Sequence, residues 1–355
     1  MKIKFLKAYN GDSIHISFKE GSKNRNILID GGMCATYMQK NKKGNIEFGE
    51  LKDIIDLIKE RKEIIDLLIL THVDDDHIGG ILKWFENDES AYSLIGKVWF
   101  NSGRLISEHF KVEEIKENLI ILNPSETTDT SIGQGIIFED YIEEKDIWDR
   151  KLIKNNVEFK YLGLVFKILS PSTDKLKLLL KKWEEEYPDS IYTAAEKNDY
   201  DMTLSEHIEV DKFKEDTKEH NGSSIAIVIT YNEKNIVFLG DAHPTVVANS
   251  LKYFKYTIEN PLNAELVKIS HHGSKANSSI EMINLINTKK YVISTNGDRH
   301  AHPNKQFLGR LASINNDCEI YFNYPEQIKT IFLEQDYKDF PNFKPLVMNN
   351  NEISI

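Results

Sequence analysis

Short apolar runs that end abruptly in polar residues recur along the chain and predict buried strands followed by loops. A run of roughly four to eight apolar residues, rich in Ile, Val and Leu, is typical of a strand covered on both faces. The clearest examples are 64–70, 235–239, 266–270 and 291–295, and residues 1–6 have the same character. Helices are expected over 280–286 and from about residue 305. We therefore expect the loops after these strands to open at the same sheet edge.

The ten residues after the strand at 64–70 hold five side chains that can bind metal ions. They are residues 71–80 and read Thr-His-Val-Asp-Asp-Asp-His-Ile-Gly-Gly. Residues alternate between faces along an extended segment, so His72, Asp74 and Asp76 are expected to point the same way. His77 begins the next turn or helix and can reach a second ion close to the first.

An acidic, solvent-exposed turn with two surface histidines is the alternative interpretation of this segment. It fits poorly, because the preceding seven-residue strand carries only one charged residue, Asp66. Carboxylates at the end of such a buried strand repel one another, and burying them is costly unless a cation neutralises them. Gly79 and Gly80 are expected to let the following helix begin close to the metals. The segment therefore predicts a metal centre.

The same segment resembles the His-x-His-x-Asp-His-x-Gly-Gly signature of the metallo-β-lactamase fold hydrolases, with Asp74 in the place of the second histidine. The resemblance implies an α+β fold, an αββα sandwich in which two mixed β-sheets pack face to face with helices outside. It also implies two divalent metal ions. A carboxylate in place of an imidazole favours harder ions, so manganese and magnesium become alternatives to zinc.

Three later motifs follow in the order found in the hydrolase domain of the DNA-uptake protein ComEC and its soluble relatives, which the chain resembles. They are Gly240-Asp241, His271-His272-Gly273-Ser274 and His302-Pro303, each after a predicted strand. The resemblance implies that Asp241 bridges both metals, that His271 is a ligand, and that His272 is a ligand or a supporting donor. Each motif also has an ordinary explanation, as a turn, a packed histidine or a loop histidine before a helix. The order of the motifs favours the functional one.

Residues near these motifs are expected to support the site. Asp30, in the Asp-Gly-Gly turn at 30–32, is expected to form hydrogen bonds rather than to bind metal. Asn221, or alternatively His220, lies where relatives often carry another histidine. Ser274 and Lys275 precede the predicted helix at 280–286, where backbone amides and a positive side chain suit a phosphate.

Hydrolysis is the expected reaction. Water acidified by the two metals attacks a carbonyl or phosphorus centre, and the ions stabilise the charge that develops. Asp76 or Asp241 orients the nucleophile, and His302 or His272 donates a proton to the leaving oxygen. The leading substrate is a phosphodiester, with DNA or another nucleic acid implied by the resemblance. The alternatives are a small ester, lactone or phosphocholine-type molecule, and a partner-activated component of a defence system.

Composition predicts a single domain over residues 1–355 with insertions at about 84–163 and 176–221. The chain is 40% hydrophobic and 28% charged, which suffices for a full core. Each insertion is expected to be either a lid over the substrate or an exposed helix without such a role. The two cysteines, Cys34 and Cys318, have no metal-like spacing and imply no disulfide framework.

The remaining sequence features concern location and partners. No apolar run is long enough to cross a bilayer and the first residues lack an apolar signal core, so a cytoplasmic protein without membrane contact is expected. The formal net charge of −11 opposes loose binding to long nucleic acid. A local basic stripe near the site is still conceivable, formed by Lys275, Arg299, Lys305 and Arg310. Nucleic acid thus stays a candidate substrate, and a protein partner or a homo-oligomer stays open.

Overall fold

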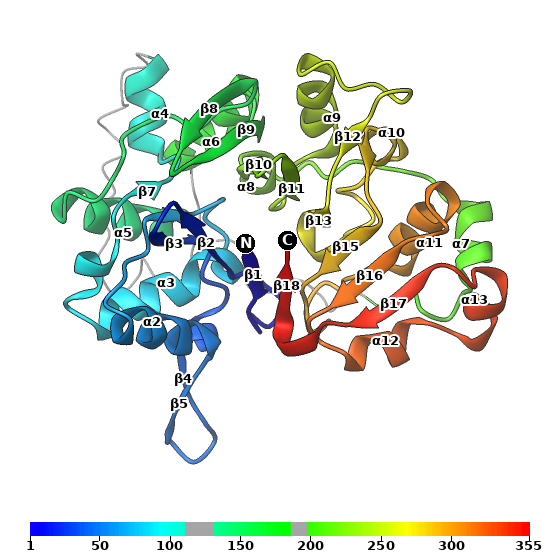
Figure 1. Cartoon of the computed structure of the whole chain (residues 1–355), viewed down its shortest axis with the longest axis horizontal. Coiled ribbons are helices and arrows are strands. Elements are labelled where there is room, and N and C mark those ends of the chain that lie inside the picture. The colour runs from blue at the N-terminus through cyan, green and yellow to red at the C-terminus, as the bar shows by residue number, and fades with distance from the viewer. Residues whose placement is uncertain (111–130, 186–196) are drawn as a thin grey trace.

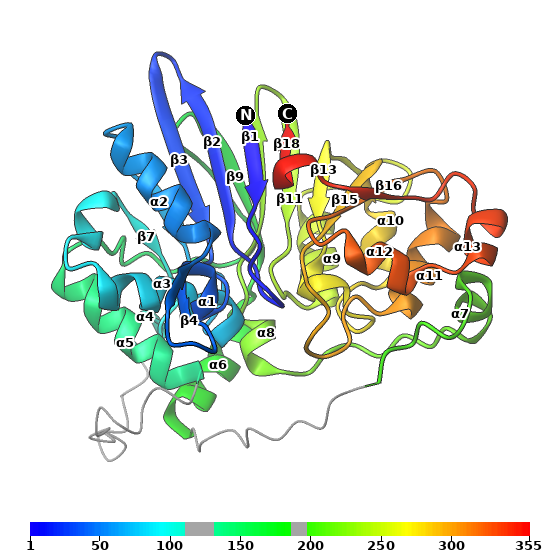
Figure 2. The ribbon, with the colours of Figure 1, turned by 90° about the horizontal axis from the view of Figure 1, so that it is seen from below.

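Two β-sheets packed face to face, with helices on both outer sides, form the centre of the molecule in the computed structural model (Figures 1 and 2). The structure describes residues 1–110, 131–185 and 197–355. This arrangement confirms the predicted αββα sandwich. The two chain ends lie side by side, and the amino group of Met1 donates a hydrogen bond to the carbonyl oxygen of Ile355 at 3.1 Å (Figure 1).

Within the described residues the first sheet has six strands in the order β18-β1-β2-β3-β6-β7. They are β1 (Lys2–Phe5), β2 (Ile14–Glu20), β3 (Lys23–Ile29), β6 (Leu67–Ile69), β7 (Val98–Trp99) and β18 (Glu352–Ser354). The β1, β2 and β3 strands are antiparallel neighbours, whereas β6 runs parallel to β3 and to β7.

In the same described part of the chain the second sheet has eight strands in the order β17-β16-β15-β13-β11-β10-β9-β8. They are β8 (Val157–Tyr161), β9 (Leu164–Ser170), β10 (Ala226–Tyr231), β11 (Lys234–Phe238), β13 (Leu266–Lys268), β15 (Lys290–Ile293), β16 (Glu319–Phe322) and β17 (Lys344–Val347). Strands from β8 to β11 pair antiparallel, and those from β11 to β17 pair parallel. Both sheets are therefore mixed, as predicted.

The layer between the sheets is built from side chains that alternate along the strands. Ile27 and Ile29 of β3 belong to the same buried cluster as Ile227 and Ile229 of β10. Every second residue points into this layer because a strand has a period of two. The opposite face of each sheet is covered by helices, which close two further apolar clusters.

Helices on the outer side of the first sheet include α2 (Glu50–Glu60), α3 (Asp75–Asn87), α4 (Gly103–Phe110), α5 (Ser131–Glu144) and α6 (Thr173–Glu185). Those beside the second sheet include α9 (Pro244–Tyr253), α10 (Ile280–Asn284), α11 (Lys305–Ile314) and α12 (Glu326–Ile331). Shorter helices are α1 (Cys34–Tyr37), α7 (Leu204–Val210), α8 (Glu219–Gly222) and α13 (Glu334–Asp339). Two further two-stranded pairs are the antiparallel hairpin of β4 (Met38–Lys40) and β5 (Ile46–Phe48) and the parallel pair of β12 (Leu262–Asn263) and β14 (Ile286–Asn287).

The expected insertions turn out to contribute to the core. In the first, the sequence predicts a strand over 97–100, a helix over 106–119 and a loop at 123–128. β7 and α4 lie where the strand and the helix are predicted, whereas the second half of that helix and the loop fall outside the described residues. In the second, Leu176, Leu179 and Leu180 of α6 are buried beneath the helical layer. This stretch is therefore a packed helix and not a free lid. None of the described helices is long and apolar enough to cross a membrane.

Candidate metal centre

The ligand-rich segment at 71–80 changes from an extended loop to a helix. Strand β6 ends at Ile69, His72 and Asp74 lie in the following loop, and α3 begins at Asp75. The predicted alternation along a strand therefore stops at Asp74. Asp76 reaches the same side because it stands in the first turn of α3, beside His77.

The paired glycines act at a different contact from the one predicted. A Cβ atom on Gly80 would lie 2.0 Å from the carbonyl oxygen of Gly31, and one on Gly79 would lie 3.0 Å from the amide nitrogen of Cys34. The amide of Gly31 in turn donates to the carbonyl of His77 at 2.7 Å. The glycines thus let α3 pack directly on the Asp-Gly-Gly turn, and it is this turn that fixes the start of the helix.

Asp30 forms the supporting hydrogen bonds that were predicted for it. Its carboxylate accepts from the backbone amide and the hydroxyl of Thr71, both at 2.7 Å, and from Nδ1 of His77 at 2.8 Å. A proton held on Nδ1 leaves Nε2 of His77 as the nitrogen that can bind a metal. Asp30 itself is buried and adopts a left-handed backbone conformation with φ of 58°.

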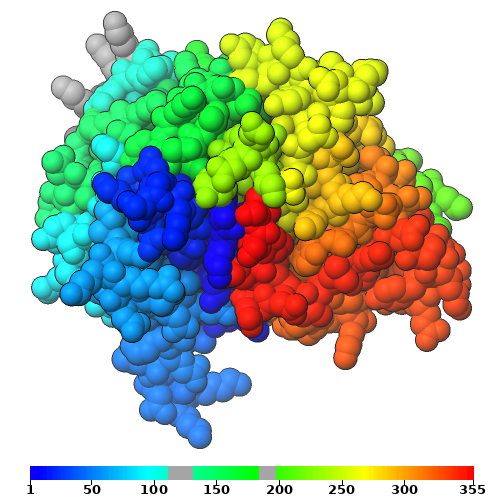
Figure 3. Space-filling view, in the orientation of Figure 1, coloured from blue at the N-terminus to red at the C-terminus, as the bar shows by residue number. Residues whose placement is uncertain are grey.

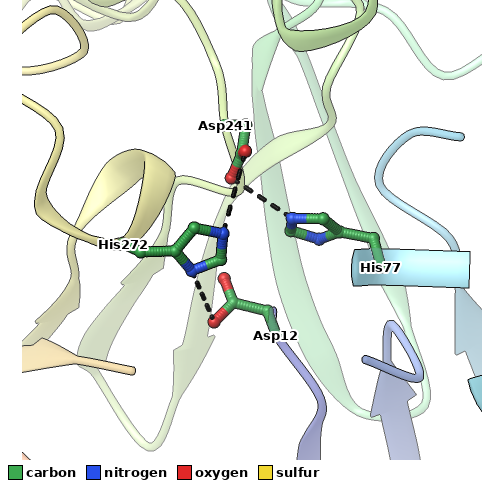
Figure 4. A group of neighbouring side chains, drawn as sticks. All are labelled: Asp12, His77, Asp241 and His272. Carbon is green, nitrogen blue, oxygen red and sulfur yellow. Dashed lines mark ion pairs between the residues drawn. The ribbon is translucent and has the colours of Figure 1, made fainter. Parts of the chain in front are cut away.

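Asp241 follows β11, Leu239 and the turn residue Gly240, and its carboxylate faces both His77 and His272 (Figure 4). Its Oδ1 lies 3.5 Å from Nε2 of His77. Its Oδ2 lies 3.8 Å from Nε2 of His72 and 3.6 Å from Nε2 of His271. Oδ2 also lies 3.9 Å from Nε2 of His272. Oδ1 thus faces His77, whereas Oδ2 faces His72, His271 and His272, so one carboxylate is in reach of the ligands of two ions, as a bridging ligand must be.

His272 has the geometry of a ligand on the His77 side. Its Nε2 lies 3.5 Å from Oδ2 of Asp76 and 3.9 Å from Oδ2 of Asp241. Its Nδ1 lies 3.1 Å from the carbonyl oxygen of Ser294, which suits a proton on Nδ1 and a free Nε2. One of the two metal positions would thus be lined by Asp76, His77, Asp241 and His272.

His220, the less favoured alternative, lies beside Asp74 in place of Asn221. Nδ1 of His220 is 2.8 Å from Oδ1 of Asp74, and Oδ2 of Asp74 is 3.7 Å from Nε2 of His72. Asn221 instead donates from Nδ2 to Oδ2 of Asp216 at 2.6 Å. Because α8 carries both residues in one turn, their side chains diverge, and sequence position alone could not separate them. His220, and not Asn221, therefore contacts Asp74.

Asn277 and Asp216 hold the His271 side and were missed by the sequence reasoning. Oδ1 of Asn277 lies 2.9 Å from Nδ1 of His271, and its Nδ2 donates to the carbonyl of Asp241 and to Asp216, both at 3.1 Å. Nothing in the spacing of these residues marks them. Asn277 lies 36 residues from Asp241 and 61 residues from Asp216 in the chain, and only folding brings these three residues together.

Asp12 and Lys268 form a buried ion pair behind His272. Nζ of Lys268 lies 2.6 Å from Oδ2 of Asp12, and Oδ1 of Asp12 lies 3.6 Å from Nδ1 of His272 (Figure 4). Ligand-type atoms of Asp12, His77, Asp241 and His272 all lie within 4.8 Å of one another. Asp12 nevertheless faces Nδ1 of His272, whereas Nε2 of His272 faces Asp76 and Asp241. We therefore interpret Asp12 as a residue that orients His272 and not as a metal ligand. A sequence signal existed, because Lys268 interrupts an otherwise apolar strand.

The donor atoms fit divalent cations. Nε2 of His72, His77 and His272 and Oδ1 of Asp241 are buried without a hydrogen-bond partner, which is costly unless another group satisfies them. Two ligands of a tetrahedral zinc-like ion, each about 2.1 Å from it, stand about 3.4 Å apart. The distances of 3.5 to 3.9 Å between the facing atoms are close to that value.

Charges in the cluster perturb the acidity of its members. Burial would raise the pKa of the Asp241 carboxyl, but His271, His77 and His272 outweigh burial and hold it well below its usual range. Burial disfavours protonated His272, yet the carboxylates of Asp12 and Asp241 raise its pKa to about 9. The imidazoles and carboxylates thus stabilise one another's charges in the absence of a cation, and metal binding must displace the imidazole protons.

His302 lies at the edge of this cluster. Its ring centroid is 4.9 Å from that of His271, the residue is buried, and its Nδ1 has no hydrogen-bond partner. Burial and then the neighbouring His271 lower the pKa of His302 well below its usual value. It is therefore a neutral imidazole near pH 7.

The predicted phosphate cradle at Ser274 and Lys275 does not form as expected. The Ser274 amide donates to the carbonyl of His271 and the Lys275 amide to Oδ1 of Asn304, both at 2.9 Å. Helix α10 starts only at Ile280. The backbone amides are thus already bound, and only the exposed side chain of Lys275 remains for an anion.

The proposed basic stripe is also shorter than expected. Lys305 is buried and pairs with Asp336 at 2.6 Å, and Arg310 is buried and pairs with Asp211 at 2.7 Å. These two cations fix helix α11 to its neighbours. Lys275 and Arg299 are exposed.

Comparison with known proteins bears on the first part of the chain. Residues 12–115 match the family model described as the metallo-beta-lactamase superfamily. The matched segment contains Asp30 and the whole 71–80 motif. The chain has the metallo-β-lactamase fold. No curated protein matches it.

Solved structures with the metallo-β-lactamase fold are similar over the full length but distant in sequence. The metallo-beta-lactamase fold protein YhfI from Bacillus subtilis is 12% identical, with a TM-score of 0.40 and coverage of 98% of this chain and 95% of that one. An isothiocyanate hydrolase from Delia radicum gut bacteria is 14% identical, with a TM-score of 0.40 and coverage of 100% and 99%. At this distance the likenesses carry no argument about substrate.

Proposed function

We propose that this chain is a metal-dependent hydrolase that works with two divalent cations. The observation that carries the proposal is the placement of Asp241, whose Oδ1 faces the buried, unsatisfied Nε2 of His77 and whose Oδ2 faces those of His72 and His272. The match of residues 12–115 to the metallo-beta-lactamase superfamily supports the same reading.

The ligands divide into two sets that share Asp241. His72, Asp74 and Asp241 would hold one ion, with His220 and His271 in reach. Asp76, His77, Asp241 and His272 would hold the other. Such cations, when bound, acidify a water molecule toward neutral pH and stabilise negative charge on the atom under attack.

The protein's own groups would orient the ligands and handle protons. Asp30 holds the metal-binding tautomer of His77, and Asn10 donates from Nδ2 to Oδ2 of Asp76 at 3.1 Å. His302 is neutral near pH 7 and its buried Nδ1 has no hydrogen-bond partner, so this nitrogen is open to a hydrogen bond with the attacking water or the leaving group during proton transfer. We therefore favour His302 over His272 for proton transfer, since His272 faces the carboxylates of Asp76 and Asp241.

A phosphodiester is the substrate class that the ligand set supports best. Three of the eight candidate side chains nearest the two positions are carboxylates, and Asp74 replaces the histidine of the related signature. Hard oxygen ligands favour manganese or magnesium alongside zinc, and these ions bind phosphate oxygens well. Nucleic acid is the leading phosphodiester by resemblance to ComEC.

The test is hydrolysis and metal content measured on the same protein samples. The chain would be loaded with manganese, zinc or magnesium and assayed on bis(p-nitrophenyl) phosphate, single- and double-stranded DNA, RNA and p-nitrophenyl acetate. We expect two ions per chain and phosphodiester cleavage. Asp76→Asn should lose cleavage and one ion. Asp75→Asn is the matched control, because Asp75 accepts a hydrogen bond from Gln134 at 2.8 Å, and it should keep both.

Each adverse result would point elsewhere. Cleavage of the carboxylic ester alone would replace the phosphodiesterase proposal with a small-ester hydrolase. Full metal loading without any cleavage would favour a partner-activated component. A chain that binds no divalent ion would overturn the proposal.

A further inference from the structure

The β4–β5 hairpin projects from the body of the protein (Figures 1 and 3). Its strands pair Met38 with Phe48 and Lys40 with Ile46. Almost every residue from 39 to 48 is exposed. A two-stranded hairpin buries too little apolar surface to be stable by itself, and its exposed surface is therefore a candidate for binding.

The tip of the hairpin is a rigid, cationic turn. Oδ1 of Asn41 accepts hydrogen bonds from the amides of Lys43 at 2.9 Å and Asn45 at 3.0 Å, which fixes the turn. Lys40, Lys42 and Lys43 are exposed, and within the described part of the chain none of them has an ion-pair partner. The one acidic residue of the hairpin, Glu47, accepts a hydrogen bond from Nδ2 of Asn41 at 2.9 Å. A net positive projection is unusual on a chain with a formal charge of −11.

Two large apolar side chains accompany these lysines. Ile46 is 53% exposed and Phe48 is 59% exposed. Nζ of Lys52 lies 5.3 Å from the centroid of the Phe48 ring, a cation–π distance. An exposed aromatic ring among lysines is the combination that binds single-stranded nucleic acid, because lysines contact phosphates and the ring stacks on a base.

The hairpin is anchored at the rim of the metal centre. Nε2 of Gln39 donates to the hydroxyl of Tyr9 at 2.9 Å. The next residue, Asn10, donates to the metal-ligand candidate Asp76 at 3.1 Å. A strand held by the hairpin would therefore be held beside the site where phosphodiesters are proposed to be cut.

We propose that the β4–β5 hairpin binds the backbone of a single-stranded polynucleotide substrate through Lys40, Lys42 and Lys43, with Phe48 stacking on a base. This rests on the proposed phosphodiesterase function and names its substrate class. The hairpin adds three exposed lysines to the exposed Lys275 and Arg299, whereas Lys305 and Arg310 are buried in internal ion pairs.

Binding of a fluorescently labelled single-stranded DNA oligonucleotide, measured by anisotropy at several salt concentrations, tests the proposal. The full chain carrying Asp76→Asn prevents cleavage during the measurement. Adding Lys40→Gln, Lys42→Gln and Lys43→Gln together should make the fall of log affinity with log salt less steep by about 2, because each phosphate contact contributes about 0.7 to the slope. Phe48→Ala should weaken binding about fivefold or more with little change in that slope.

A charge-matched triple variant controls for the loss of three lysines. Lys234→Gln, Lys338→Gln and Lys344→Gln remove exposed lysines of β11, α13 and β17, and this variant should keep the wild-type slope. With Asp76 intact, the hairpin variant should hydrolyse bis(p-nitrophenyl) phosphate at the wild-type rate, since this small substrate does not reach the hairpin.

The outcomes separate the two proposals. Hairpin-dependent DNA binding without hydrolysis of any phosphodiester would keep the hairpin inference and remove the proposed function. Hydrolysis of the small phosphodiester without DNA binding, or with binding equally reduced in both triple variants, would overturn the hairpin inference alone. A hairpin variant that binds DNA as the wild type does, but loses self-association or binding to a protein, would also overturn the hairpin inference.

Discussion

Replacing Glu139 with glutamine should stabilise the protein at alkaline pH and have little effect in acid. Glu139 lies in α5 with its side chain 2% exposed, and it accepts a hydrogen bond from the hydroxyl of Ser102 at 2.6 Å. Burial raises the pKa of its carboxyl to about 7, against the opposing contributions of Ser102 and Arg104. The buried group therefore keeps its proton where an unfolded chain would lose it.

The sign and size of the effect follow from this difference. The unfolded carboxyl ionises near its ordinary pKa of 4.5, so the folded state binds more protons between that value and about 7. Stability is lost as pH rises across this window. A rise of the Glu139 pKa from 4.5 to about 7 lowers the free energy of unfolding by about 3 kcal/mol at pH 8, and by no more than about 1 kcal/mol at pH 5. Glu139→Gln removes the ionisation and can still accept from Ser102.

Urea unfolding at pH 5, 6, 7 and 8 measures the effect, read from the midpoint at an unchanged slope. The gain of Glu139→Gln over wild type should grow from pH 5 to pH 8. Asp140→Asn, on the same helix with a side chain 61% exposed, removes the same charge and should show no such growth. An equal gain at all pH values would show that ionisation is not its cause. Destabilisation at pH 8 would show that the folded carboxyl is charged and held by Arg104.

Three further predictions concern the candidate centre. Divalent ions at about 100 times their dissociation constant should stabilise the fold by about 2.7 kcal/mol, seen as a rise in melting temperature that EDTA reverses and that Asp241→Asn abolishes. Asp30→Asn should weaken metal binding about 10- to 100-fold, measured by competition with a chromogenic chelator; an unchanged affinity would mean that Asp30 does not orient His77. Gly80→Ala should lower stability by about 1 to 3 kcal/mol or more, because its Cβ would lie 2.0 Å from the carbonyl of Gly31; an unaltered melting temperature would refute the packing role assigned to Gly80.

The local elements and the central motif were predictable from sequence because both are encoded over short stretches. Apolar runs such as 64–70 and 266–270 indicated β6 and β13, and the segment at 71–80 concentrated ligand-type side chains after one of them. The resemblance to the metallo-β-lactamase signature then implied the sandwich, which the structure confirms. The assignment of individual ligands stays a prediction, although His72, Asp74, Asp76, His77, Asp241 and His271 do come together.

Long-range contacts were decided only by the tertiary structure. The pairing of His220 with Asp74 joins residues 146 positions apart, and Lys268 reaches Asp12 across 256 positions. A sequence pattern reports which residues share a strand face or a helix turn, since these depend on backbone periods. It does not report which side chain of an adjacent pair turns toward the centre, or that Lys305 and Arg310 are buried in ion pairs. Those outcomes depend on how separate elements pack, and packing is a property of the whole chain.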